Sequence, residues 1–184
     1  MKIVAIVGSP RAAGNASYLV DQALDEAGKL GMTTEKIMLG QYEIQPCSAH
    51  DNCGEQAQCP QKDDAARVLE EFYDADGVIL ASPVYYFNVS ALMKLFMDRN
   101  RFNRRRGMVP KARSAGLIAV AASSGLEPTL DAMRHFVRLT RARVAPEKIL
   151  TVSGLSNRLG DVKVKPPLVE EARRLGRQMA EQLS

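Results

Sequence analysis

The sequence predicts a doubly wound α/β domain built on a parallel sheet of five strands. Short apolar runs rich in β-branched residues alternate along the chain with longer segments whose apolar residues recur at helical spacing. The runs are continuous rather than alternating, which is typical of strands buried on both faces. The length of 184 residues fits one domain, so we expect residues 1–184 to form a single unit.

The expected strands are short and separated by helical segments. Gly8 ends the first strand, and the second is less apolar than the others, so we place it at an outer edge. The five expected strands are residues 3–7, 34–39, 78–81, 117–121 and 149–152.

Amphipathic patterns predict five helices between and after these strands. Gly31 is placed to end the first helix, and Pro128 to open the fourth. The third is apolar on most sides, so we expect it at the core or at a subunit contact. The five expected helices are residues 20–30, 64–73, 89–100, 129–143 and 168–183.

Charged residues are distributed unevenly between the two halves of the chain. Lys and Arg number 25 against 21 Asp and Glu, yet residues 1–92 carry 6 basic and 13 acidic side chains while residues 93–184 carry 19 and 8. Such asymmetry is compatible with nucleic acid, an anionic cofactor or an anionic substrate. The composition, 46% hydrophobic and 25% charged, excludes a disordered or collagen-like chain.

Targeting and membrane segments are not expected from the sequence. No apolar run approaches the roughly 18–20 residues that a membrane span needs. The run at residues 3–7 is shorter than the roughly 7–15-residue core of a signal peptide. We therefore expect a cytoplasmic protein with no membrane partner.

The loop after the first expected strand carries groups that bind a phosphate monoester. Residues 8–17 read Gly-Ser-Pro-Arg-Ala-Ala-Gly-Asn-Ala-Ser and run directly into a helix. The helix N-terminus offers backbone N–H groups, Ser9 and Ser17 offer hydroxyls, Asn15 offers an amide and Arg11 a guanidinium. The alternative is a plain strand-to-helix turn with Asn15 or Ser17 as N-cap.

Two other phosphate-binding motifs do not fit this loop. A dinucleotide fingerprint needs a glycine two positions after Gly8, where Pro10 stands. A P-loop needs Lys directly after its second glycine, where Asn15 stands. The loop therefore predicts an anion site of a different kind.

Three consecutive aromatic residues follow the third expected strand. Tyr85, Tyr86 and Phe87 stand out in a chain with five Tyr, five Phe and no Trp. Aromatic side chains at a ligand-binding edge suit a flat ring system, and Asn88 offers polar groups to a ring edge. The alternative is packing within the loop or at a dimer contact. The small residues 122–125, after the fourth strand, permit close approach to a ring.

In combination these motifs resemble the flavodoxin-like NADPH-dependent FMN reductase family over residues 1 to about 155. The loop at residues 8–17 is similar to its phosphate loop, and Pro-Val-Tyr before a helix ending in Asp-Arg is similar to its isoalloxazine loop. The resemblance implies a flavodoxin-like fold that binds FMN. The residues it places around the cofactor are Ser9, Arg11, Asn15, Ala16, Ser17, Pro83, Val84, Tyr85, Phe87, Asn88, Ser123 and Gly125.

All three cysteines lie in a long insertion at about residues 45–63. A connection of this length suggests a function. The insertion resembles the compact cysteine motif of iron-sulfur flavoproteins, a branch of the same family, which holds a [4Fe–4S] cluster. Cys47, Cys53 and Cys59 match the first, third and fourth cysteines of that motif, and His50 stands at the second.

The substitution at His50 leaves three interpretations of the insertion open. Histidine replaces cysteine in some iron-sulfur clusters, so Cys47, His50, Cys53 and Cys59 are candidate cluster ligands. The same four side chains suit a Cys3His zinc site. The third interpretation is a loop that holds neither.

A basic segment follows the third expected helix. We interpret it as a solvated loop or a subunit contact, and the alternative is attraction of the phosphates of FMN or NAD(P)H. No recognised nucleic-acid motif accompanies it, so we do not expect nucleic acid as a partner. Its residues are Arg99, Arg101, Arg104, Arg105, Arg106, Lys111 and Arg113.

The family resemblance implies an enzyme that takes electrons from NAD(P)H, passes them through FMN and delivers them to an unnamed second acceptor. A hydride would pass from nicotinamide C4 to flavin N5, so no side chain is expected as a catalytic acid or base. A cluster would convert two-electron input to single-electron output. The alternative is a non-catalytic FMN electron carrier or a redox-responsive binding protein. The resemblance also implies a homodimer or homotetramer.

Overall fold

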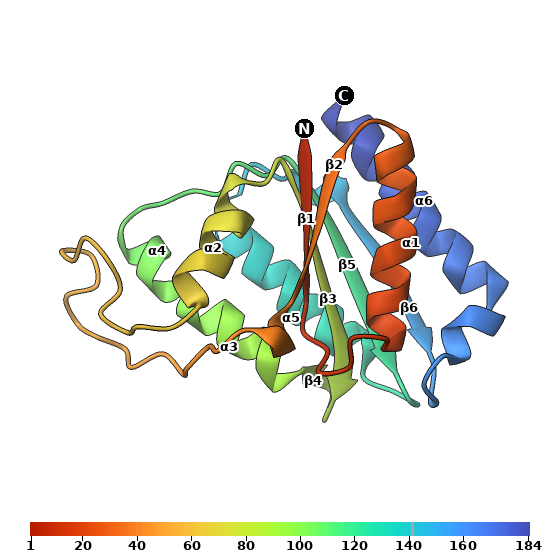
Figure 1. Cartoon of the computed structure of the whole chain (residues 1–184), viewed down its shortest axis with the longest axis horizontal. Coiled ribbons are helices and arrows are strands. Elements are labelled where there is room, and N and C mark those ends of the chain that lie inside the picture. The colour runs from red at the N-terminus through yellow and green to blue at the C-terminus, as the bar shows by residue number, and fades with distance from the viewer. Residues whose placement is uncertain (141) are drawn as a thin grey trace.

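The computed structural model describes residues 1–140 and 142–184. Their sheet contains five parallel strands in the order β2-β1-β3-β5-β6, the order of flavodoxin-like doubly wound folds (Figure 1). A short sixth strand, β4, pairs antiparallel with the end of β3, so the expectation of five strands was one too few. The strands are β1 Lys2–Val7, β2 Thr33–Met38, β3 Gly77–Tyr85, β4 Asn88–Val89, β5 Ser114–Ala121 and β6 Ile149–Leu155.

Helices cover both faces of the sheet, as Figure 1 shows. One layer consists of α1 (Asn15–Lys29) and α6 (Pro166–Leu183). The opposite layer contains α2 (Ala65–Asp74), α3 (Ala91–Arg99) and α5 (Leu126–Leu139), with the short helix α4 (Arg101–Arg105) following α3. Short 3-10 helices span Leu39–Gln41, Pro146–Lys148 and Asp161–Val164.

The sheet separates two apolar cores, because successive side chains of a strand point to opposite faces. Ile3, Ala5 and Val7 of β1 pack toward α1 and α6, while Val4 and Ile6 pack toward α2, α3 and α5. All five side chains are buried. This two-sided burial is the physical reason for the continuous apolar runs in the sequence.

Three helix predictions need correction at their ends. The expected helix at residues 20–30 starts earlier, at Asn15, and ends at Lys29. The expected helix at residues 89–100 begins only at Ala91, because Val89 pairs with β3 and Ser90 caps the helix by accepting a hydrogen bond from the N–H of Met93. The expected helix at residues 129–143 starts earlier, at Leu126, and ends at Leu139. Residue 141 of that expected helix lies outside the described residues.

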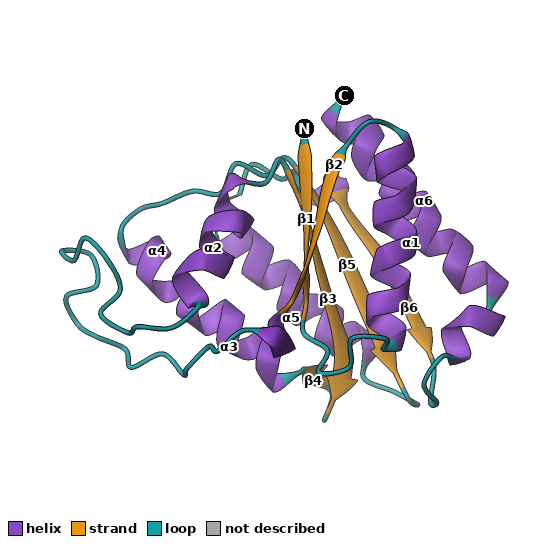
Figure 2. Cartoon of the chain, viewed as in Figure 1, coloured by secondary structure: helices purple, strands orange, loops and turns teal. Residues whose placement is uncertain are grey.

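The parallel strands end at one edge of the sheet, and their loops gather there (Figure 2). Gly8, directly after β1, lies at this edge and packs closely against the start of α3. A Cβ atom at Gly8 would lie 2.7 Å from the Cβ of Met93 and 2.9 Å from the Oγ of Ser90. Only glycine lets the first loop come this close to α3, so this residue fixes where the loop starts.

Candidate functional site

A cavity of about 230 Å³ lies at the carboxyl edge of the sheet. The end of β3 and the loops that follow β1, β5 and β6 line it, as expected for ligand sites in doubly wound folds. We call it the carboxyl-edge cavity. Its lining residues are Ser9, Arg11, Gly14, Asn15, Ala16, Pro83, Val84, Tyr85, Val120, Ala122, Ser156, Asn157 and Leu159.

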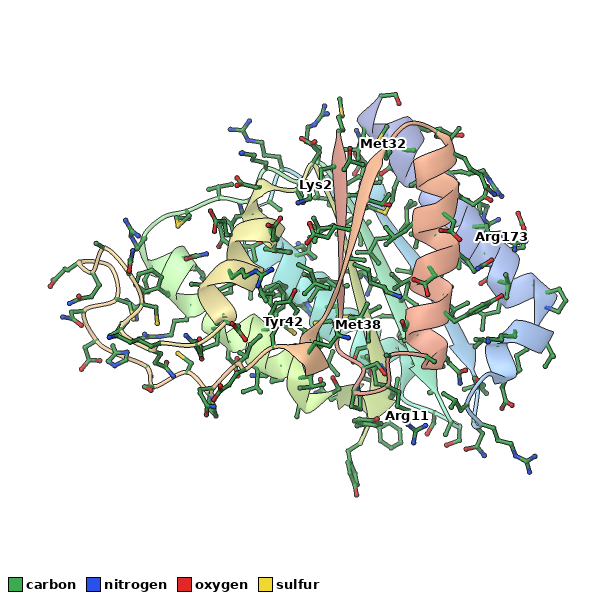
Figure 3. The ribbon with its side chains drawn as sticks, in the orientation of Figure 1. Lys2, Arg11, Met32, Met38, Tyr42 and Arg173 are labelled. Carbon is green, nitrogen blue, oxygen red and sulfur yellow. The ribbon has the colours of Figure 1, made fainter. Side chains whose placement is uncertain are left out.

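The first loop contributes the cationic side of the cavity. Arg11 is exposed at the lower edge of the view in Figure 3, below the ends of the strands. Buried Ser9 holds the loop in a tight turn, because its Oγ accepts a hydrogen bond from the N–H of Arg11 at 3.1 Å. Helix α1 begins with no side-chain cap and no acid in its first turn. The first N–H groups of a helix have no intrahelical partner, and in α1 no capping side chain satisfies them, so they favour an anion.

Two residues expected at the phosphate have other partners in the structure. The Oγ of Ser17 is buried, accepts a hydrogen bond from Lys36 Nζ at 3.2 Å and faces Met38 Sδ, and Ser17 does not line the cavity. The side chain of Asn15 lines the cavity, but its amide bonds to Ser156, Arg158 and Gly160.

A tight hairpin turn carries the aromatic residues beside the cavity. Tyr85 pairs with Asn88 across the turn, and Tyr86 and Phe87 between them have φ angles of 49° and 61°. Positive φ at both central residues defines a type I′ turn, which usually needs Asn and Gly. Tyr86 is fully exposed and Phe87 is 62% exposed, so the strained backbone presents two aromatic rings to solvent.

The loop after β5 supports the aromatic turn. Gly125 has a φ angle of 87°, and a Cβ atom there would lie 2.9 Å from the Cα of Phe87 and from Cγ1 of Val84. Exposed Ser123 precedes it. Neither Ser123 nor Gly125 lines the carboxyl-edge cavity, and nor do Phe87 and Asn88. These four predicted residues therefore form a rim beside the cavity rather than its wall.

The predicted cysteine site is not assembled as a metal centre. Within residues 1–140 and 142–184, no three His, Cys, Asp or Glu side chains gather so as to hold a metal ion. The sulfur of Cys47 accepts a hydrogen bond from the N–H of Ala49 at 3.4 Å, and that of Cys53 donates to the carbonyl of His50 at 3.0 Å. The donor types suit a cluster or zinc, but this arrangement does not.

Three arginines hold the cysteine insertion, the long extended loop at the left of Figures 1 and 2. Arg99 pairs with Asp63 and donates to the carbonyl of Gln45 at 3.1 Å and to Cys59 Sγ at 3.6 Å. We call the insertion, residues 45–63, the cysteine loop. We call Arg99, Arg101 and Arg106 the arginine clasp.

The other two arginines of the clasp hold the middle of the loop. Arg101 Nη1 donates to the carbonyl of His50 at 2.9 Å and contacts Cys53 Sγ at 3.3 Å. Arg106 donates to the carbonyl of Ala57 at 2.6 Å. Arg99 is buried and Arg101 is half-buried, so the interpretation of the basic segment as a solvated loop is wrong for these two residues, whereas Arg106 is exposed.

The remaining basic residues of that segment divide between pairing and exposure. Lys111 pairs with Asp74 at 2.8 Å, and Arg113 donates to the carbonyl of Leu183 at 3.2 Å. Arg104 and Arg105 are exposed on α4. They line a larger hollow, of about 930 Å³, between the cysteine loop and α3, α4 and α5.

The ion pair at the base of the cysteine loop is buried. The side chains of Arg99 and Asp63 are 3% and 2% exposed. Burial by itself would raise the pKa of Asp63, but hydrogen bonds from Arg99 and from the N–H groups of Gln45 and Ala65 outweigh it and lower the pKa. Asp63 therefore stays ionised and ties both ends of the loop together.

Sequence reasoning missed one wall of the carboxyl-edge cavity. Ser156, Asn157 and Leu159 follow β6 and line the cavity. The rule that located the other loops, polar residues directly after a parallel strand, applies to Ser156 and Asn157 as well. The signal was present, but the resemblance that guided the site ends near residue 155.

Comparisons with known proteins identify relatives of the chain. The family model described as NADPH-dependent FMN reductase matches residues 1–155. An iron-sulfur flavoprotein of Methanocaldococcus jannaschii is 37% identical over 187 residues, covering 98% of this chain and 96% of that protein. An iron-sulfur flavoprotein of Methanosarcina thermophila is 32% identical over 141 residues, covering 76% of this chain and 74% of that protein.

Solved structures share the fold. An FMN-dependent NADH-azoreductase from Bacillus anthracis, solved with FMN, superposes with a TM-score of 0.74 at 15% identity, over 98% of this chain and all of that one. At this identity the likeness concerns the fold alone. In the described part of the chain, none of the helices has the length and apolar character needed to cross a membrane.

Proposed function

The chain belongs to the NADPH-dependent FMN reductase family, and on that premise we propose how its residues serve FMN-dependent oxidoreduction. The enzyme takes electrons from NAD(P)H and passes them through FMN to a second acceptor. The observation that carries this function is the carboxyl-edge cavity, where an uncapped helix N-terminus and Arg11 face an apolar wall.

The phosphate end of FMN belongs at the first loop. The N–H groups of Asn15, Ala16 and Ser17 at the start of α1 donate to the phosphate, and the guanidinium of Arg11 offsets its charge. Ser9 holds the turn that aims Arg11. The acid-free first turn of α1 removes the repulsion that a nearby carboxylate would exert.

The flavin ring belongs on the other side of the cavity. At about 230 Å³ the cavity is smaller than the roughly 300–1,000 Å³ of typical small-molecule sites, so a bound flavin ring would also need the surface beside it, toward the turn that carries Tyr86 and Phe87. Pro83, Val84 and Tyr85 form the apolar wall there, and Ser123 and Gly125 form the rim. When bound, FMN supplies the redox chemistry, accepting a hydride from the nicotinamide and releasing electrons to the acceptor.

No step of this proposal runs through the cysteine loop. The names of the relatives favour an iron-sulfur cluster, whereas the four candidate ligands are not gathered here. Assays of iron, zinc and sulfide on anaerobically purified protein decide among the three interpretations. Iron with sulfide indicates a cluster, zinc alone a zinc site, and neither an empty loop.

A visible spectrum and a nucleotide titration test the function. We expect the purified or reconstituted protein to bind FMN and to be bleached anaerobically by NADPH or NADH. Failure to take up FMN would contradict the proposal. FMN that neither nucleotide bleaches would favour the alternative, a non-catalytic electron carrier. Light scattering of the same sample tests the expected homodimer or homotetramer.

A further inference from the structure

The turn after β6 is held by a single side chain of α1. Asn15 Nδ2 donates to Ser156 Oγ at 2.7 Å and to the carbonyl of Arg158 at 2.8 Å. Asn15 Oδ1 accepts a hydrogen bond from the N–H of Gly160 at 2.9 Å. We call residues 156–160 the β6 turn. Since a side-chain amide has two N–H donors, Asn15 has none left for a phosphate.

The β6 turn has further supports that fix it at the cavity. The N–H of Ser156 donates to the carbonyl of Ala121 at 2.7 Å, which continues the pairing with β5 one residue beyond the end of β6. The N–H of Arg158 donates to Asp161 Oδ2 at 2.7 Å. Gly160 takes a φ angle of 85°, a conformation that suits glycine. The turn is thus tied to both β5 and α1.

Two polar residues of the turn line the cavity: Ser156, whose Oγ already accepts a hydrogen bond from Asn15, and Asn157. Exposed Asn157 lines the cavity together with Arg11, and Leu159, which is 59% exposed, lies beside it. The turn approaches from the side of α1, where the helix N-terminus favours an anion. A neutral amide there adds a hydrogen-bond donor without changing the charge of the site.

We propose that Asn15 is a positioning residue that holds the β6 turn, and that Asn157 is a further FMN-binding residue whose amide donates to the phosphate-bearing end of the cofactor. This rests on the proposed function, because it concerns the same cavity. It differs from the role at the phosphate that the family resemblance implies for the Asn15 side chain. The turn lies beyond residues 1–155, which the family model matches.

Three variants and a control test the two roles through the dissociation constant of FMN, measured by quenching of flavin fluorescence in the apoprotein. Asn157→Ala removes one neutral hydrogen bond and is expected to raise the Kd about fivefold. Asn15→Ala frees the whole turn and is expected to raise the Kd about tenfold or more, because it displaces Ser156 and Leu159, which also line the cavity, together with Asn157. The control, Asn52→Ala, changes an exposed asparagine in the cysteine loop and should leave the Kd unchanged.

The double variant Asn15→Ala/Asn157→Ala separates positioning from direct contact. If Asn15 acts through the turn, the contact of Asn157 is already lost, and the double variant stays within about twofold of Asn15→Ala alone. If Asn15 binds FMN itself, the two effects multiply to about fiftyfold, which overturns the positioning role. An Asn157→Ala variant with the FMN affinity of the wild type overturns the binding role.

Hydrogen exchange keeps the positioning role testable even where Asn15→Ala fails to fold or the wild type takes up no FMN. Asn15→Asp keeps the acceptor oxygen for Gly160 but loses both donors to the turn. We expect faster amide exchange at residues 156–160 in this variant than in the wild type, without FMN. Unchanged exchange there contradicts the positioning role, whereas a wild type that binds no FMN contradicts the proposed function.

Discussion

The carboxyl-edge cavity and the cysteine loop both direct hydrogen-bond donors at electron-rich groups, but they are built differently. The cavity uses backbone N–H groups at the start of α1, with Arg11 four residues before the helix. The cysteine loop uses side chains of distant helices, and Arg99 is 36 residues from Asp63 in sequence. A local turn forms the first site, and long-range side-chain pairs form the second.

The difference predicts where mutations act. Substitution of Arg11 removes a contact to a ligand and leaves the first loop folded, because that loop is held by the backbone of Arg11, which bonds to the N–H of Gly14 and to Ser9 Oγ. Substitution of Arg99 in the arginine clasp leaves a buried carboxylate without its partner, so it acts on stability. The following predictions test this division, beginning with the largest expected effect.

Loss of Arg99 should destabilise the protein most. Arg99→Met leaves the carboxylate of Asp63 buried without a counter-ion, and breaking such a pair costs about 3–5 kcal/mol. Urea unfolding measures the loss. Arg104→Met, at an exposed arginine of α4, is the matched control and should change the free energy of unfolding by less than about 0.5 kcal/mol. Equal effects of the two variants would show that the clasp does not hold the loop.

Arg11 should affect binding rather than stability. Arg11→Met removes a charge-assisted contact to phosphate, so FMN should bind about 10–100-fold more weakly while the free energy of unfolding stays within about 0.5 kcal/mol. Titration of the apoprotein with FMN measures the affinity. Arg174→Met, at an exposed arginine of α6, controls for the loss of charge. A fall in stability comparable to that of Arg99→Met would contradict the division between the two regions.

Acid should weaken the base of the cysteine loop by less than Arg99→Met does, because a protonated Asp63 keeps hydrogen bonds. The folded pKa of Asp63 is lowered, so the unfolded state binds the proton first as the pH falls. The stabilisation is fully present above the unfolded pKa of about 4 and is lost as the pH falls through the folded value. Proteolysis of the loop between pH 7 and pH 3 measures this, with Asp63→Asn as the variant that should lose the pH dependence.

The features that the sequence predicted are those formed by residues close together in the chain. Four of the parallel strands followed from continuous apolar runs, β2 from a less apolar run, and β4 was not predicted. Residues of the first loop and of Pro83–Tyr85 reached the cavity because neighbours in sequence are neighbours in a tight turn. The ends of helices were less predictable. Val89, which was expected to be helical, pairs with β3 as part of β4, and α3 begins only after Ser90, whose side chain caps it.

Roles that depend on distant partners escaped the sequence. Nothing near Arg99 indicates that it meets Asp63, and nothing near Asn15 indicates that its amide bonds to residues 141–145 positions away. Both side chains belong to motifs that also suit an anion. The structure shows their amide and guanidinium donors directed at the protein itself.

The turn at residues 85–88 gives the smallest expected change in stability. It lies beside the cavity, and its two central residues have strained backbone angles, so stability and FMN binding should change in opposite directions there. Replacing Tyr86 and Phe87 by Asn and Gly gives the pair that type I′ turns prefer, and relieving two positive φ angles should raise stability by about 1 kcal/mol. Both side chains are more than half exposed, so little apolar burial is lost.

The same double variant should weaken FMN binding, because it removes the rings that we place beside the flavin. Thermal unfolding and FMN titration measure the two effects, and Val164→Asn, at a 79% exposed apolar residue far along the chain, controls for loss of exposed apolar surface. Higher stability with weaker binding would mean that the strain is retained for ligand contact. Higher stability with unchanged FMN affinity would assign these two aromatic side chains to packing between subunits or to another ligand, and would leave Arg11 and α1 as the binding side of the cavity.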